Sequence, residues 1–212
     1  MSVISRKEIK RRLDLDVAEP EGLVITPLLN ADDALGDEDT VDLRLGCHFL
    51  LPRTSQQPFF CPDETSPNTF QVREHVPLGD YLVIPAHQTV LGSTLEFIKL
   101  PYDVSGQILT KSSVARTFIV VETAPWIHPR YRGCLTLEIA NVSNTPLLLY
   151  PGRPIAQLIL MDVWPKPEEK HRIDGTYIGP IYPEAPRFKS PEEELKAIGV
   201  KRVWTIPQRE LR

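Results

Sequence analysis

The stretch Gln107–Asn141, QILTKSSVARTFIVVETAPWIHPRYRGCLTLEIAN, carries the main structural and chemical signals of this chain. It passes from a polar, basic turn through a β-branched run and a proline-punctuated loop into an alternating segment. Alternation with a period of two predicts a strand that has one apolar face and one polar face. The apolar face would carry Leu135, Leu137 and Ile139, and the other face Thr136, Glu138 and Ala140.

Glu138 is the one carboxylate of that segment. An acid on the polar face of a half-exposed strand is commonly a solvent-facing residue, and the strand alone favours this interpretation. The alternative is a general acid/base at the edge of a pocket. The order of the motifs around the strand is needed to choose between the two.

The rest of the chain indicates a mainly β protein. Its twenty-one prolines are about twice the usual share, and proline is excluded from helix interiors and central strands. Repeated short strands with turn residues between them predict a sandwich or barrel of antiparallel sheets. The predicted strands lie at 23–26, 41–51, 69–74, 80–84, 89–100, 104–110, 118–122, 133–140, 146–150 and 155–163.

Two short helices are expected near the ends of the chain. Ser5 and Glu8 form a capping box, in which Ser is the N-cap and Glu the third helical residue, and Ile9 and Leu13 follow at helical spacing. A second capping box opens at Ser190 and would start a C-terminal helix that ends near Gly199.

Length and charge restrict the class of protein. A chain of 212 residues is long enough to bury a substantial core as one domain. The net charge of −4 gives no global basic field, so we expect no nucleic-acid binding. Three widely spaced cysteines indicate free thiols in a reducing compartment. With no signal-peptide core and no run of transmembrane length, we expect a cytoplasmic protein without a membrane partner.

Several motifs occur in an order that resembles the dCTP deaminase branch of the trimeric dUTPase superfamily. The motifs are VDLRLG (41–46), VLGSTLE (90–96), KSSVAR (111–116), TA (123–124), WI (126–127), YRG (131–133), LTLE (135–138), YPG (150–152) and IAQL (155–158). Together they are far more specific than any one of them.

The resemblance implies a dUTPase-like jelly roll, a β-sandwich of the β-clip type with short N- and C-terminal helices. The domain would span 1–185, with 186–212 as its C-terminal helical and strand extension. It further implies a homotrimer that deaminates dCTP hydrolytically to dUTP and ammonia. Further nucleotide ligands of such a protein would be dUTP or dTTP.

Lys111, Ser112, Ser113 and Arg116 bring two cations and two hydroxyls to one turn. Charge-assisted donors suit an oligophosphate, although a lone turn of this kind is more often just a charged surface turn. The resemblance implies triphosphate binding, with Arg116 reaching across a subunit boundary. The other substrate-binding residues that it implies are Val114, Ala115, Ala124, Ile127, His128, Thr136, Leu137, Gln157 and Tyr177.

By the same resemblance Glu138 is the catalytic acid/base, whereas true dUTPases typically have an apolar residue there. One carboxylate can move every proton that deamination requires. A zinc site is not expected, because zinc deaminases need a Cys-x-x-Cys that this chain lacks and Cys47-His48 has no partner at ligand spacing. Mg²⁺ would enter only on the substrate triphosphate.

Three departures from the family pattern stand out. His128 replaces a usual Asp, Pro125 follows Ala124 where Gly or His is common, and Thr176 stands in place of the Lys that precedes Tyr177. These departures leave open a dUTP diphosphatase, a bifunctional enzyme and a non-catalytic nucleotide-binding regulator, as well as a modified cytosine or another pyrimidine as substrate. Separately, Asp42 and Arg44 are expected to form a structural ion pair.

Overall fold

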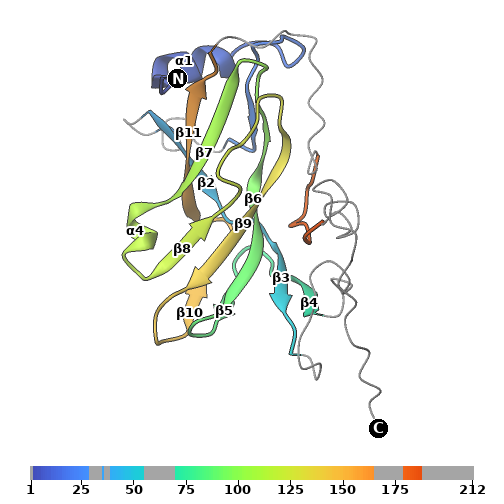
Figure 1. Cartoon of the computed structure of the whole chain (residues 1–212), viewed down its shortest axis with the longest axis vertical. Coiled ribbons are helices and arrows are strands. Elements are labelled where there is room, and N and C mark those ends of the chain that lie inside the picture. Colours follow the sequence, from blue (N-terminus) through green and yellow to red (C-terminus); the bar gives the residue numbers. More distant parts are fainter. Residues whose placement is uncertain (1, 29–34, 36–38, 55–69, 165–178, 188–212) are drawn as a thin grey trace, which may run out of the picture.

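Antiparallel strands are the main secondary structure in the described part of the chain (Figure 1). The computed structural model describes residues 2–28, 35, 39–54, 70–164 and 179–187. The strands are β1 Val24–Thr26, β2 Thr40–Arg44, β3 His48–Pro52, β4 Gln71–His75, β5 Leu82–Ile84, β6 Thr89–Lys99, β7 Val104–Thr110, β8 Ile119–Glu122, β9 Arg132–Asn141, β10 Leu147–Leu149 and β11 Pro154–Asp162. Helix α1 spans Arg6–Leu13 and helix α4 spans Ser112–Ala115.

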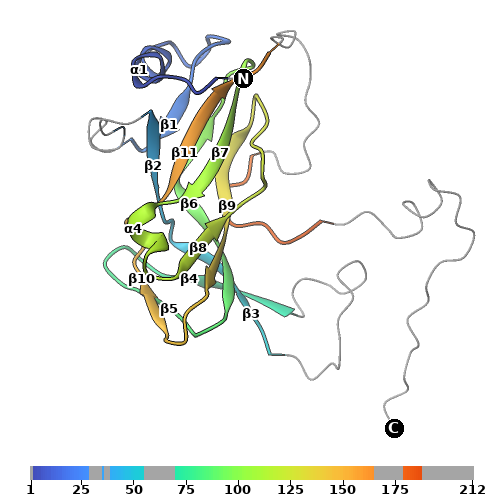
Figure 2. The same cartoon turned by 60° about the vertical axis from the view of Figure 1, so that its left-hand side comes forward.

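The strands form three sheets. The largest has the order β4-β3-β6-β9-β8, with β1 also paired to β6, and the others are β2-β11-β7 and β10-β5. Every named pair is antiparallel. In both ribbon views α1 lies at one end, β5 and β10 lie at the other, and α4 projects to one side beside β8 (Figures 1 and 2). The predicted mainly β, antiparallel fold is confirmed.

β9 has the two faces that its sequence predicts. Leu135, Leu137 and Ile139 are buried, whereas Glu138 is exposed. The core that receives the buried side chains also contains Val121 of β8, and each such side chain contributes about 1.5–3 kcal/mol by leaving water. Apolar packing therefore fixes which face of β9 is available for chemistry.

A bulge interrupts the β6–β9 ladder between Ser93 and Phe97. The Leu135 N–H, which lies in this region, donates instead to Thr94 Oγ1 at 2.9 Å. The Thr94 hydroxyl in turn donates to the carbonyl of Glu96 at 2.8 Å. The Thr94 hydroxyl thus replaces the backbone acceptor that the bulge removes. A replacement is needed because a buried N–H without a hydrogen-bond partner is costly.

Ser5 is the N-cap of α1 as predicted, but the capping box is incomplete because the Glu8 carboxylate bonds to Arg11 and Arg12 and not back to the Ser5 N–H. Ser5 Oγ accepts from the Glu8 N–H at 3.4 Å, and Ile9 is fully buried. Arg12 is also buried, and its two terminal nitrogens bond to Asp103 at 2.8 and 3.0 Å. This bidentate pair fixes the helix to the turn before β7.

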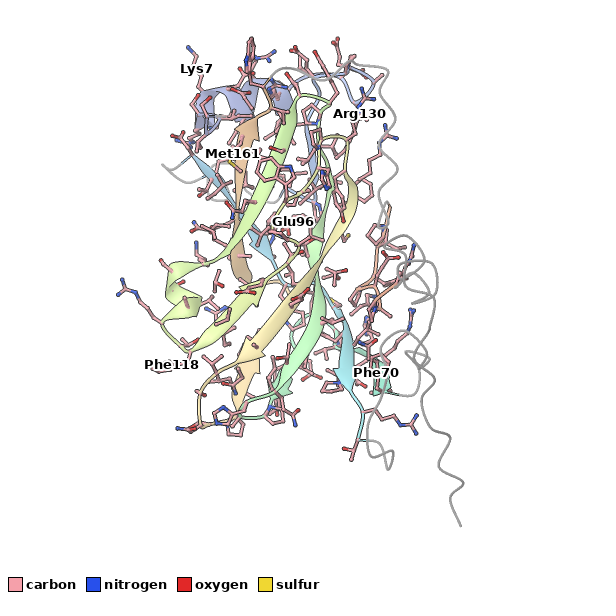
Figure 3. The ribbon with its side chains drawn as sticks, viewed as in Figure 1. Lys7, Phe70, Glu96, Phe118, Arg130 and Met161 are labelled. Atoms are coloured by element: carbon pink, nitrogen blue, oxygen red, sulfur yellow. The ribbon has the colours of Figure 1, made fainter. Side chains whose placement is uncertain are left out.

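The predicted ion pair between Asp42 and Arg44 is wrong. Arg44 Nε bonds to Glu96 Oε1 at 2.7 Å, and Asp42 bonds to Lys111. Residues two apart on a strand share a face but lie farther apart than cross-strand neighbours, so each side chain finds its partner on another element. Glu96 lies in the middle of the structure, between the layers of the fold (Figure 3).

Some predictions fall outside the described residues. They include the helix near 190–199 and the position of Tyr177. The division of the chain at 185/186 stays a prediction. Within the described part, no helix is long and apolar enough to span a bilayer.

Candidate functional site

The turn after β7 holds most of the predicted phosphate ligands. Ser112–Ala115 form the one-turn helix α4, where the sequence predicted only a turn. The side chains of Ser112, Ser113 and Arg116 are exposed. None of them makes a side-chain hydrogen bond to another described residue, so all three are available to a ligand.

Lys111 begins this turn, and its Nζ bonds to Asp42 Oδ2 on β2. Gln157 lies opposite Asp42 in the β11–β2 ladder and donates to Asp42 Oδ1 at 3.2 Å. Asp42 therefore holds two of the predicted substrate-binding residues, one on each carboxylate oxygen. The sequence interpretation missed this role because it paired Asp42 with the wrong cation.

A cavity of about 440 Å³ opens beside the same turn. Lys111, Ser113, Tyr150 and Arg153 contribute polar side chains to its lining, and apolar residues such as Leu45, Ile119 and Leu149 complete it. Arg153 adds a third cation to the two already predicted for this region. The arrangement suits an anion that carries several charges.

Glu138 lies on the exposed face of the largest sheet. Its partner in the β9–β6 ladder is Leu91, and its partner in the β9–β8 ladder is Glu122. Among the described residues Glu138 has no hydrogen-bond or ion-pair partner. Both of its carboxylate oxygens are thus free to accept protons or hydrogen bonds from a ligand.

The loop between β8 and β9 is fixed at two points. Thr123 Oγ1 donates to the carbonyl of Thr136 at 2.7 Å. Ile127 exchanges two backbone hydrogen bonds with Gly106, at 2.8 and 3.0 Å. Ala124 lies between these two points and His128 directly follows the second. Both are exposed, as contacts with the sugar and the base would require.

Two of the predicted contact residues face the core. Ile127 is buried and both of its backbone polar groups are engaged, and the Leu137 side chain is fully buried. Neither side chain reaches the exposed face of the sheet. Thr136, in contrast, is half-buried on the same face as Glu138.

Thr110 links the phosphate turn to the carboxylate face. Its Oγ1 donates to the carbonyl of Val121 at 2.9 Å and accepts from the Val121 N–H at 2.8 Å. Lys111 follows Thr110, and Glu122 follows Val121. Thr110 thus holds the end of β7 against β8, one residue before the predicted phosphate turn and one residue before Glu122.

The segment 179–187 reaches β9 from the C-terminal part of the chain (Figure 2). The Gly179 N–H donates to the carbonyl of Arg132 at 2.6 Å, and the Cys134 N–H donates to the carbonyl of Pro180 at 2.7 Å. The Glu184 N–H then donates to Thr136 Oγ1 at 3.2 Å. The last of these contacts, at Thr136, lies on the same face of β9 as Glu138.

The fold defines a class of protein that has been seen in crystals. The structure is similar to that of 2'-deoxycytidine 5'-triphosphate deaminase from Agrobacterium tumefaciens, with a TM-score of 0.55 and 23% identity over 74% of this chain and 47% of that chain. This likeness concerns the fold.

The sequence itself identifies the family. The family model described as dCTP deaminase-like matches residues 3–163. The chain is 30% identical over 202 residues to a Methanobrevibacter smithii protein named "dCTP deaminase, dUMP-forming", covering 92% of this chain and all of that one. It is 35% identical over 152 residues to a protein of the same name from Mycolicibacterium paratuberculosis, covering 71% of this chain and 78% of that one. The chain belongs to the dCTP deaminase-like family.

Proposed function

We propose that this protein is a dCTP deaminase that converts dCTP and water to dUTP and ammonia, with Glu138 as general acid/base. The observation that carries the proposal is Glu138 itself. It is held on a rigid strand, faces solvent, has no partner among the described residues and is connected through β8 to a cationic, hydroxyl-rich turn. The names of the relatives support the same reaction.

One carboxylate can move all the protons of this reaction. Glu138 takes a proton from the attacking water and delivers it to N3 of cytosine while the water oxygen bonds to C4. It then takes the proton of the new hydroxyl and delivers it to the amino group, which leaves as ammonia when the C4 carbonyl forms. The carboxylate ends in its starting state, and N3 keeps its proton as uracil requires.

The triphosphate would lie against Lys111, Ser112, Ser113 and Arg116, with Gln157 beside them. Charge-assisted hydrogen bonds from such groups hold phosphate oxygens strongly. Mg²⁺ fits this arrangement as an ion carried on the phosphates, because it keeps several waters and takes few protein ligands. Both oxygens of Asp42 already accept hydrogen bonds, so we assign it the positioning of Lys111 and Gln157.

A homotrimer is part of this proposal. The β5–β10 sheet leaves Val83 and Leu148, which are directly paired, exposed on its outer side. Tyr81 and Tyr150 lie beside them in edge contact at 6.1 Å between ring centroids. An exposed apolar surface of this kind is typical of a subunit contact, and a neighbouring subunit would bring Arg116 to its site.

A second candidate is a bifunctional enzyme that also releases pyrophosphate and so forms dUMP. The relatives named dUMP-forming favour it. His128 does not favour it, because an imidazole ring is a poor replacement for a carboxylate that orients a hydrolytic water. Incubation with dCTP and Mg²⁺, measured for ammonia and pyrophosphate together, separates the two candidates. A protein that binds dCTP and releases neither product would be a nucleotide-binding protein without turnover.

Glu138→Gln tests the mechanism. The amide keeps the shape of the side chain and removes the base, so we expect dCTP to bind while ammonia release falls at least ~100-fold. Stability should change little, because the side chain is exposed. Glu74→Gln, on the exposed outer strand β4, is the matched control and should deaminate normally. Deamination by Glu138→Gln at the wild-type rate would refute the mechanism.

A further inference from the structure

Glu122 lies directly opposite Glu138 in the antiparallel β8–β9 ladder. Directly paired residues of such a ladder point to the same face of the sheet, with Cβ atoms about 4.5–5.5 Å apart. Both side chains are exposed. The proposed acid/base is therefore one of two adjacent carboxylates, and the second has no role in the mechanism described above.

Nothing among the described residues compensates the charge of this pair. Neither carboxylate has a hydrogen-bond or ion-pair partner there, and the neighbour of Glu138 on its other side is the apolar Leu91. Like charges opposite each other weaken a strand pair. The ladder nevertheless holds them in register, because Thr110 fixes Val121 beside Glu122 and Thr123 is bonded to the carbonyl of Thr136.

An ionised carboxylate only accepts hydrogen bonds. At C4, cytosine carries an amino group, which donates, and uracil carries a carbonyl oxygen, which accepts. A second carboxylate beside the acid/base therefore favours the pyrimidine that still has its amino group. It disfavours the deaminated product, whose oxygen would face a carboxylate without a proton between them.

We propose that Glu122 is a specificity-determining residue that accepts a hydrogen bond from the 4-amino group of the substrate base and so discriminates cytosine from uracil nucleotides. This inference rests on the proposed function, because it takes Glu138 to be the residue that reacts at the same ring position. Glu122 moves no proton. Its effect lies in the relative binding of substrate and product.

The test measures that relative binding without turnover. The α,β-imido forms of dCTP and dUTP are titrated calorimetrically into full-length protein carrying Glu138→Gln, with and without Glu122→Gln. A Gln amide can accept from the amino group of cytosine or, once rotated, donate to the carbonyl of uracil. We expect the ratio of the dUTP to the dCTP dissociation constant to fall at least about tenfold, the scale of one hydrogen bond to a charged group.

Two further measurements separate this role from the alternatives. Glu122→Gln alone should keep kcat for dCTP within about tenfold of wild type, whereas a loss as large as that of Glu138→Gln would make Glu122 a proton carrier and overturn the inference. Glu74→Gln should leave the binding ratio unchanged. If adding Glu122→Gln to Glu138→Gln leaves the ratio of dissociation constants unchanged while the wild-type protein deaminates dCTP, the inference alone is overturned. A wild type that binds neither nucleotide overturns the proposed function as well.

Discussion

The ion pair between Arg44 and Glu96 is buried, and its surroundings allow us to predict how much stability is lost when Arg44 is replaced. Glu96 is 0% exposed and accepts from the Arg44 backbone N–H at 2.9 Å and from Nε at 2.7 Å. Arg44 Nη2 also donates to the carbonyl of Pro27 at 2.8 Å. Arg44→Leu would leave a buried carboxylate without its counter-charge.

Removing one partner of a buried ion pair costs about 3–5 kcal/mol. Each kcal/mol lowers Tm by about 2–4 °C in a domain of this size, so we expect Arg44→Leu to lose about 6–20 °C. Adding Glu96→Gln should restore most of the loss. It removes the charge and keeps an oxygen for the backbone N–H of residue 44.

The loss should depend on pH. Burial raises the pKa of Glu96 above its ordinary 4.5, and the hydrogen bonds and charge of Arg44 act against this rise. A raised folded pKa gives stability that is fully present below the unfolded pKa and is lost as pH rises through the folded pKa. Without Arg44 the pKa of Glu96 rises further, so the deficit of the variant relative to wild type should grow as the pH rises above the ordinary carboxylate pKa of 4.5.

Urea unfolding of both proteins at equal protomer concentration measures these quantities. A loss below about 1 kcal/mol at neutral pH, or a deficit that shrinks as pH rises, would show that Arg44 does not compensate Glu96. The double variant is the control for packing. If it were as unstable as Arg44→Leu, the lost volume of Arg44 and not the uncompensated charge would be responsible.

Two further predictions concern assembly and the C-terminal segment. Light scattering of the purified protein should give the mass of a trimer, and a monomer that deaminates dCTP would contradict the shared site. In Gly133→Ala, the new Cβ would lie 2.6 Å from Pro180 Cδ at a φ of +141°, so we expect the segment 179–187 to leave β9 and trypsin to cleave after Arg187 faster. Gly79→Ala is the control, since it has a φ of +94° with nothing within 4 Å and should add backbone strain without changing cleavage.

The sequence predicted the strands well because the alternation of apolar and polar residues is a local property. The buried and exposed sides of β9 follow directly from it, and Ser5 correctly marked the start of α1. The sequence did not reveal which strands are neighbours, and this limited how much of the candidate site could be predicted. Asp42 meets Gln157 because β2 and β11, which are distant in the chain, pair in one register, and Glu122 meets Glu138 because of the register of the consecutive strands β8 and β9. Local pattern fixes which face of each strand is buried and so constrains the register, but it does not say which strand is the neighbour.

The alternation of buried and exposed side chains on β9 affects which mutations this protein can accept. Leu135, Leu137 and Ile139 hold the sheet together, while Thr136 and Glu138 point the other way. Mutations at the second set leave the packing of the first untouched. New base preferences are therefore accessible through single substitutions on one side of an unchanged scaffold, and a library that varies 122 and 136 while keeping Glu138 should contain mostly folded proteins.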